Sequence, residues 1–268
     1  MANIIAEISK VQRSPRFNHP TLFFCILFVI SYEYLFQNMV QNKFSFIFKE
    51  KKRNIHINGF TCEIGSCYTL ITGTGRAGTS ALMAILTELG LPTGFSLKEV
   101  RKIDDTSFRA GLEICGGKDS LKCIRKGNFS SIEIYKSITV ASQPVQLSKS
   151  TDVFGRIIVL VRDTVLNSAL SRAAQNNKGN IEGGFWKGAS SFADMLSVNY
   201  VLLAELVSSL EDSDMPHIYI SYPKFANDKK YAYKKLFGAS GALHFYNISF
   251  HSFIAAHKQV IKLNSGLS

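Results

Sequence analysis

The segment YTLITGTGRAGTSALMAILTELGL (68–91) constrains the fold more than any other stretch of the chain. Its pattern predicts a short buried strand over 68–72, a glycine-rich turn, and a helix over 80–89 that stops at Gly90 and Pro92. Glycines in such a turn permit positive φ angles and close backbone approach, and the free N–H groups at the start of the helix point at an anion. The segment therefore predicts a phosphate-binding turn.

The remainder of the chain from residue 55 alternates apolar runs with helical patterns. Strands are expected over 155–163 and 217–222, and helices over 165–175, 190–211 and 228–241. Strands that alternate with helices indicate parallel pairing. We expect a three-layer α/β sandwich with a central parallel sheet in a domain over 55–268. The stretch 97–145 has no clear pattern.

Composition limits the classes of partner. The 268 residues are 46% hydrophobic and carry a net charge of +11, which indicates a globular chain that favours an anionic partner. Zinc-finger spacings, arginine-glycine tracts and RNA-binding aromatic motifs are absent from the sequence, so nucleic acid is the weaker choice. An acidic membrane surface or a small polyanionic ligand fits better.

Residues 1–54 read as an N-terminal leader. The apolar run 21–36, TLFFCILFVISYEYLF, is slightly short for the roughly 20 residues that span a membrane, and it contains Glu33. We expect a single-pass anchor at about residues 21–37 and hence a membrane location. A buried leader on a cytoplasmic protein is the alternative.

The cysteines and two glycosylation sequons leave the compartment open. Cys62 with Cys67, and Cys115 with Cys123, could form local disulfides in an oxidising lumen, or remain thiols in a reducing compartment. The sequons are at 128–130 and 247–249, and so short a pattern often arises by chance.

Three interpretations of the loop GTGRAGTS compete. A nucleoside triphosphate loop, GxxxxGK[ST], would need lysine where Thr79 stands. A dinucleotide fingerprint, GxGxxG, is matched by Gly73, Gly75 and Gly78, but the acidic residue expected further along is replaced by the stretch 91–95, LPTGF. The third interpretation rests on a family resemblance.

TGTGRAGTS resembles the 5′-phosphosulfate loop of the sulfotransferase family, with Arg76 at its basic position and Gly78, Thr79 and Ser80 at its Gly-Thr-Ser ending. A second stretch, RIIVLVRDTVLNSALSRAA (156–174), is similar to the family's 3′-phosphate motif, a strand that ends in Arg before a helix that bears a Ser.

The resemblance implies a P-loop-containing nucleotide-binding fold and a sulfotransferase. Such an enzyme moves a sulfuryl group from 3′-phosphoadenosine 5′-phosphosulfate to a hydroxyl or amine of a small-molecule or carbohydrate acceptor, with no metal required. Arg76 would be catalytic. The residues expected to bind the donor are Gly73, Thr74, Gly75, Arg76, Ala77, Gly78, Thr79, Ser80, Arg162 and Ser171.

The match departs from the family at the serine. Leu170 stands in the usual register, with Ser168 and Ser171 close by, and Ser171 is favoured because Arg172 could share the phosphate. Lys149 resembles a lysine that lines the site in some branches of the family.

The sequence does not identify a general base for the acceptor. The carboxylate candidates lie in the variable stretch after the first helix, and the histidines are undecided. These residues are Asp104, Asp105, Glu113, His217, His244, His251 and His257.

Two other functions stay open. One is a P-loop kinase or NTPase that has lost its lysine, for which Asp163 would be the acidic Mg²⁺ residue. The other is a non-catalytic binding protein on the same fold.

Overall fold

The computed structural model describes residues 68–73, 75–102, 112–115, 120–126, 132–176 and 189–265. The chain divides into two compact units, Met1–Phe60 and Thr61–Ser268, and every described residue belongs to the second. The expected leader, its anchor at about 21–37 and the boundary after residue 54 lie outside the described residues and stay predictions.

A four-stranded parallel sheet forms the centre of this unit. Its strands are β1 (Tyr68–Thr72), β2 (Ile134–Lys136), β3 (Phe154–Arg162) and β4 (His217–Tyr222), in the spatial order β2-β1-β3-β4. Every pairing is parallel. The expected α/β class with a parallel sheet is therefore confirmed.

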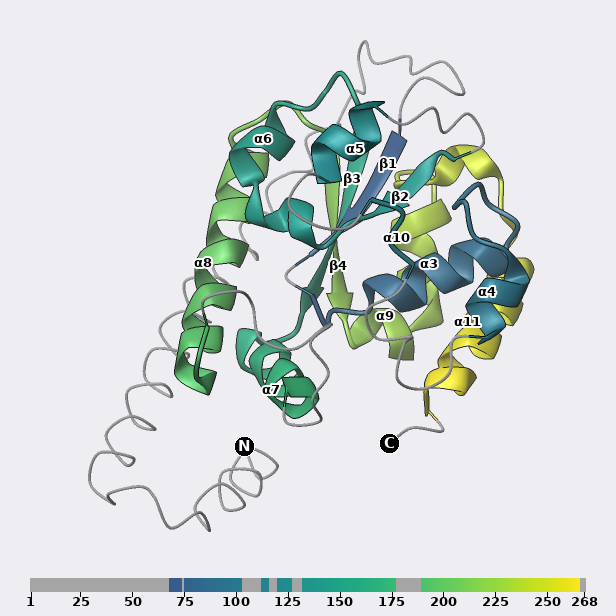
Figure 1. Ribbon diagram of the computed structural model, residues 1–268. Helices are drawn as coiled ribbons and strands as arrows, with labels where there is room; N and C mark the ends of the chain where they lie inside the picture. The colour runs from purple at the N-terminus through teal and green to yellow at the C-terminus, as the bar shows by residue number, and fades with distance from the viewer. Residues whose placement is uncertain are drawn as a thin grey trace. The chain divides into compact units, whose positions relative to one another are not determined.

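Helices cover the sheet. The described ones are α3 (Thr79–Glu88), α4 (Leu97–Lys102), α5 (Ser120–Lys126), α6 (Pro144–Ser148), α7 (Val165–Asn176), α8 (Phe192–Glu211), α9 (Lys224–Asn227), α10 (Lys229–Phe237) and α11 (Phe250–Ser265), with 3-10 turns η1 (Thr139–Ser142) and η2 (His244–Tyr246). Figure 1 shows α6, α7 and α8 on one side of the sheet and α3, α10 and α11 on the other.

The strand order creates a switch point between β1 and β3. From β1 the chain goes to β2 on one side, and it then returns past β1 to β3 and β4 on the other. Ligands of open α/β sheets bind in the crevice at the carboxyl ends of strands where the order reverses in this way. The topology therefore predicts a ligand-binding site at the segments that follow β1 and β3.

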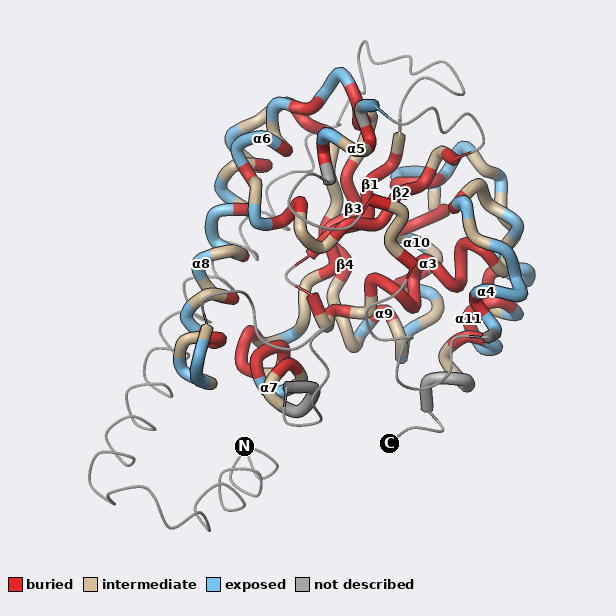
Figure 2. Tube along the Cα trace, viewed as in Figure 1, coloured by how far each residue is buried: buried red, intermediate tan, exposed pale blue. Residues whose placement is uncertain are grey.

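The main core lies between the sheet and the layer of α3, α10 and α11. Ile71, Ile158, Leu160 and Ile220 project from the strands into it and are fully buried. Figure 2 shows buried residues concentrated in the strands and α3. Burial of each such side chain stabilises the fold by about 1.5–3 kcal/mol, so the sheet that carries the loop is firmly held.

Helix α8 has the length and apolar composition of a membrane span. A third of its most apolar window is buried in the described part of the chain. The helix begins at Phe192 because Ser191 caps it: the Ser191 hydroxyl accepts from the Asp194 amide at 3.1 Å, and the Asp194 carboxylate accepts from the Ser191 amide at 3.0 Å. Since α8 packs on α6 and α7, it also has the character of a core helix.

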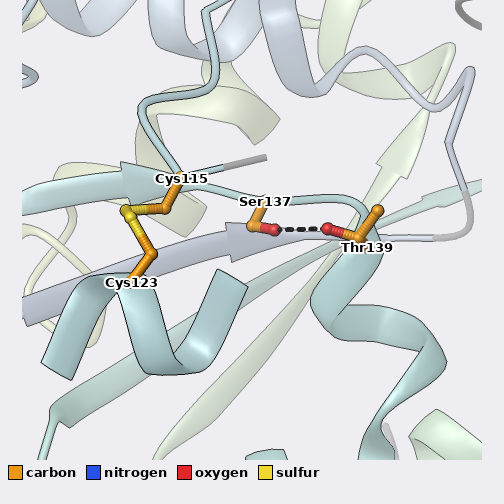
Figure 3. Close-up of a disulfide and its surroundings, with 4 residues drawn as sticks. All are labelled: Cys115, Cys123, Ser137 and Thr139. Atoms are coloured by element: carbon orange, nitrogen blue, oxygen red, sulfur yellow. Dashed lines mark hydrogen bonds between the residues drawn. A yellow bond between two sulfur atoms is a disulfide. The ribbon is translucent and has the colours of Figure 1, made fainter. Parts of the chain in front are cut away.

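Cys115 and Cys123 form a disulfide (Figure 3). The bond joins the segment 112–115 to α5. One of the two local pairings considered from the sequence is thus present, and the other, Cys62 with Cys67, lies outside the described residues.

Candidate functional site

The glycine loop connects the end of β1 to α3 in an unusual backbone conformation. Gly75, Arg76 and Gly78 have φ angles of 82°, 55° and 84°, all in the left-handed region. Gly78 is the residue immediately before α3. The start of a helix presents free N–H groups and its positive dipole end. The loop thus combines positive φ angles with a helix start, two features of phosphate-binding turns.

Two of these glycines are also closely packed against neighbouring side chains. A Cβ on Gly75 would lie 2.0 Å from Nη2 of Arg172, and a Cβ on Gly78 would lie 2.7 Å from the ring of Tyr222. Arg172 belongs to α7 and Tyr222 ends β4. The loop is therefore held from both sides by segments distant in the sequence.

The other predicted loop residues are mostly buried. Gly73 is buried directly after β1, Ala77 is fully buried, and Thr79 and Ser80 are 3% and 8% exposed at the start of α3. Thr74 lies outside the described residues. The surface of the loop is thus presented chiefly by backbone and by Arg76, which is half-buried.

Arg162 reaches the loop from the end of β3. Its Nη1 donates to the backbone carbonyl of Arg76 at 2.7 Å, and its guanidinium carbon lies 5.3 Å from the centre of the Tyr222 ring. Its Nε is buried and has no hydrogen-bond partner among the described residues. The carboxyl end of β3 therefore places a cation against the loop, as the sequence predicted.

Helix α7 brings two serines to the loop in different roles. The buried hydroxyl of Ser168 donates to the carbonyl of Gly75 at 3.1 Å, and Asn199 of α8 donates to Ser168 at 3.5 Å. Ser171 is only half-buried and accepts from Nε of Arg76 at 3.1 Å. Ser168 supports the loop from within, whereas Ser171 lies beside the guanidinium of Arg76 with part of its surface exposed.

Arg172 lies beneath the loop. The residue is 5% exposed, and burial, with a smaller contribution from the charge of Arg76, lowers the pKa of its guanidinium to about 9. Two cations held this close disfavour each other's charge, and an anion bound between them would relieve the repulsion. With Arg76 in the loop and Arg162 and Arg172 against it, three arginines meet at this site.

Lys136 is a buried cation that the sequence analysis did not identify. Its side chain is fully buried at the end of β2, and its Nζ lies 3.4 Å from Oε1 of Glu113. Burial lowers the pKa of Lys136, and Glu113 opposes that shift. The stretch IEIYK was unreadable because a strand of three residues has no periodicity to recognise; the lysine after the apolar run was the available signal.

The end of β2 also borders the loop. The hydroxyl of Thr72 donates to the carbonyl of Ser137 at 2.7 Å, and the side chain of Ile138 lies 3.4 Å from a Cβ placed on Gly75. Figure 3 shows Ser137 at this strand end, bonded through its hydroxyl to Thr139 at 3.1 Å. Three neighbouring strand ends thus converge on one loop.

The general-base candidates differ in how close they lie to the glycine loop. Asp104 and Asp105 lie outside the described residues, and Glu113 is paired with Lys136. His217 begins β4, at the opposite edge of the sheet from the loop, and bonds to Glu211 at 3.0 Å. Of Glu113 and His217, the two of these candidates that the structure describes, Glu113 contacts a strand end beside the loop.

The remaining candidates lie elsewhere. His244 and His251 are exposed, in η2 and α11, and His257 is fully buried, with its Nε2 2.9 Å from the carbonyl of Phe225. Lys149 is exposed after α6, close to the start of β3. The structure therefore does not bring Lys149 to the loop.

Asp163 directs its carboxylate at the start of α7. Its Oδ1 accepts from the Thr164 amide at 3.0 Å and from Nδ2 of Asn167 at 3.2 Å. Among the described residues, no group of three or more His, Cys, Asp or Glu side chains is arranged to hold a metal ion.

No protein-family model matches the chain, and no curated protein matches it.

Proposed function

We propose that this chain is a sulfotransferase that moves a sulfuryl group from 3′-phosphoadenosine 5′-phosphosulfate to a hydroxyl or amine of a small-molecule or carbohydrate acceptor. The observation that carries the proposal is the contact of Arg162 and Ser171 with Arg76 of the glycine loop. Two sequence motifs that resemble the family's two phosphate-binding motifs come from distant parts of the chain and meet at one point.

The site suits a nucleotide with two separate anionic groups. The loop, with its left-handed residues and the start of α3, would receive the 5′-phosphosulfate. Arg162 and Ser171 would hold the 3′-phosphate, because a guanidinium and a hydroxyl both donate to phosphate oxygens. Since the loop retains a P-loop-like turn without its lysine, we assign the fold to the P-loop nucleotide-binding type as part of this proposal.

Positive charge at the loop supplies the chemistry. The donor provides a sulfuryl group on a phosphate leaving group, and transfer spreads negative charge over the sulfuryl and bridging oxygens. Arg76 and the loop amides would stabilise that charge, in the way that fixed donors assist phosphoryl transfer. Lys136, buried at the adjacent strand end, adds a further cation near the same edge.

Binding to two nucleotides separates this proposal from its alternatives. The purified full-length chain is titrated calorimetrically with adenosine 3′,5′-bisphosphate and, in parallel, with ATP and Mg²⁺. We expect binding of the bisphosphate with weak or no binding of ATP. Tight binding of ATP without binding of the bisphosphate would contradict the proposal and favour a kinase or NTPase.

Turnover then distinguishes an enzyme from a binding protein. The chain is incubated with sulfur-labelled donor and a mixture of phenolic, amine and sugar acceptors, and label transfer is measured. Transfer that is lost in Arg76→Ala supports the catalytic assignment. Bisphosphate binding without transfer to any acceptor would favour a non-catalytic protein on this fold.

A further inference from the structure

The turn between η2 and α11 exposes a glycosylation sequon. Asn247 and Ser249 are both exposed, and Ile248 between them is half-buried, with its carbonyl accepting from the Tyr233 hydroxyl at 2.9 Å. The sequon pattern alone is weak support for glycosylation, because so short a pattern often arises by chance. Its acceptor amide, however, lies on the surface of a well-anchored turn, where a bulky modification can be accommodated.

The disulfide favours a compartment in which such a modification occurs. Disulfides persist in secreted proteins and in the lumen of the secretory pathway, and they are rare in the cytosol. The Cys115–Cys123 bond therefore favours the oxidising alternative left open by the sequence. Asparagine-linked glycans are found on surface loops of proteins in the same setting.

An exposed aromatic ring precedes the acceptor in the chain. Phe245, two residues before Asn247, is 44% exposed, and the Arg156 guanidinium lies over its ring at 4.3 Å. The ring of Tyr246 is a further neighbour at 4.4 Å. Phe245 therefore presents apolar ring surface to water. The apolar face of a pyranose ring has suitable chemistry to cover it.

The turn lies away from the glycine loop. Tyr246 donates its hydroxyl to Glu133 at 2.6 Å, just before β2, and Arg156, which donates to the Ala242 carbonyl, is near the start of β3. Both anchors are at the amino ends of parallel strands, whereas the loop is at their carboxyl ends. A large group attached to Asn247 would leave the loop accessible.

We propose that Asn247 carries an N-linked glycan whose first sugar packs on Phe245. In the reaction, Nδ2 of Asn247 forms a bond to the anomeric carbon of an oligosaccharide carried on a lipid diphosphate. The bond from that carbon to the diphosphate oxygen breaks, the diphosphate leaves with the electron pair, and one amide proton is released to solvent. This inference does not depend on the proposed sulfotransferase activity.

Both sequon residues also have structural roles, and these determine the variants. Asn247 has a φ of 50°, a left-handed conformation that asparagine tolerates, and Ser249 accepts from the Ser252 amide at 3.0 Å at the start of α11. Asn247→Gly keeps the backbone conformation without the acceptor. Ser249→Asp keeps the cap without the sequon, and Ser249→Thr keeps both.

Attachment is tested on the full-length chain translated in the presence of endoplasmic-reticulum microsomes. The wild type and Ser249→Thr should show a gel shift that peptide N-glycosidase removes, and Asn247→Gly and Ser249→Asp should each lose one step of it. Asn128→Gln, at the other sequon, should retain the step that belongs to Asn247. A wild-type chain with no glycosidase-sensitive shift, or a shift unchanged in Asn247→Gly, would overturn the proposal.

Packing of the sugar is tested by thermal unfolding before and after enzymatic deglycosylation. We expect the melting temperature of the wild type to fall by roughly 2–4 °C when the glycan is trimmed. In Phe245→Ala, which removes the ring, trimming should have little effect. An equal fall in both proteins would overturn the assigned contact with Phe245.

Discussion

At the scale of single residues, Arg76 contacts both of the other residues that define the candidate site, Arg162 and Ser171. Its side chain donates to Ser171, its backbone carbonyl accepts from Arg162, and its φ of 55° is unusual for a residue with a side chain. A left-handed conformation costs a non-glycine residue about 1–2 kcal/mol. Such strain persists only where surrounding contacts enforce it, and it often occurs at functional sites. The contacts from β3 and α7 supply that enforcement here.

Gly75→Ala tests the tight fit between the loop and α7. We expect the free energy of unfolding to fall by roughly 1–3 kcal/mol, because the substitution combines a positive φ with a Cβ placed 2.0 Å from Arg172. Bisphosphate affinity should fall as well, since either the loop or Arg172 must move. Urea denaturation and calorimetry measure the two effects.

Gly90→Ala is the matched control for Gly75→Ala. Gly90 has a similar φ of 74°, but a Cβ there would meet nothing within 4 Å. It should therefore show only the backbone cost and leave bisphosphate affinity unchanged. Equal effects of the two substitutions on affinity would contradict a role for packing of Arg172 against the loop.

At the scale of secondary-structure elements, the sequence predicts the strongly patterned elements but misses the short ones and the 16-residue helix α11. Strands β1, β3 and β4 and helices α3, α7, α8 and α10 were expected to within a few residues. Strand β2 was missed because its three residues are stabilised by pairing with β1 and not by local pattern. Helix α11 was not expected either, although it buries Phe253 and Val260 in the main core.

The same division holds for the candidate site. The sequence alone predicts one site for Arg76, Arg162 and Ser171, because the two motifs that contain them each follow a clear strand. The role of Lys136 could not, since it depends on the position of β2 beside β1. The support that Ser168 gives to Gly75 is also tertiary: only the packing of α7 against the loop shows which serine is buried.

Packing of α11 gives a prediction of pH dependence. His257 is buried between α11 and α9, and burial lowers its pKa in the folded chain, with a smaller contribution from Lys229. As the pH falls below the unfolded value of about 6.5, the unfolded chain gains a proton that the folded chain resists. Stability should therefore fall between pH 7 and pH 5.

The variant His257→Gln tests this assignment. Glutamine can donate to the Phe225 carbonyl but does not titrate, so the variant should lose less stability over that pH range, by up to about 1.4 kcal/mol for each pH unit. His251→Gln, an exposed position on the same helix, should keep the wild-type pH dependence. Chemical denaturation at each pH measures the free energy of unfolding. Identical slopes for the wild type and His257→Gln would refute the assignment.

At the scale of the whole molecule, the parallel sheet explains why the site is where it is. The order β2-β1-β3-β4 brings the ends of β1, β2 and β3 together at a switch point, and each end contributes to the same loop region. The opposite edge holds the turn at Asn247 and the pair His217–Glu211. The chain's net charge of +11 suits a site that receives a polyanionic nucleotide.

The central claim is that Arg162 and the glycine loop bind two phosphates of one nucleotide. The most direct test compares the affinities of adenosine 3′,5′-bisphosphate and adenosine 5′-monophosphate in the wild type and in Arg162→Ala. Arg156→Ala, on the same strand but at its other end, controls for loss of a partly buried arginine.

We predict that the wild type and Arg156→Ala prefer the bisphosphate by about tenfold or more, the effect of one charge-assisted contact. Arg162→Ala should lose that preference: affinity for the bisphosphate should fall further than affinity for the monophosphate, which also decreases because Arg162 supports the loop through the Arg76 carbonyl. If Arg162→Ala retained the full preference for the bisphosphate, the assignment of the 3′-phosphate to the end of β3 would be wrong.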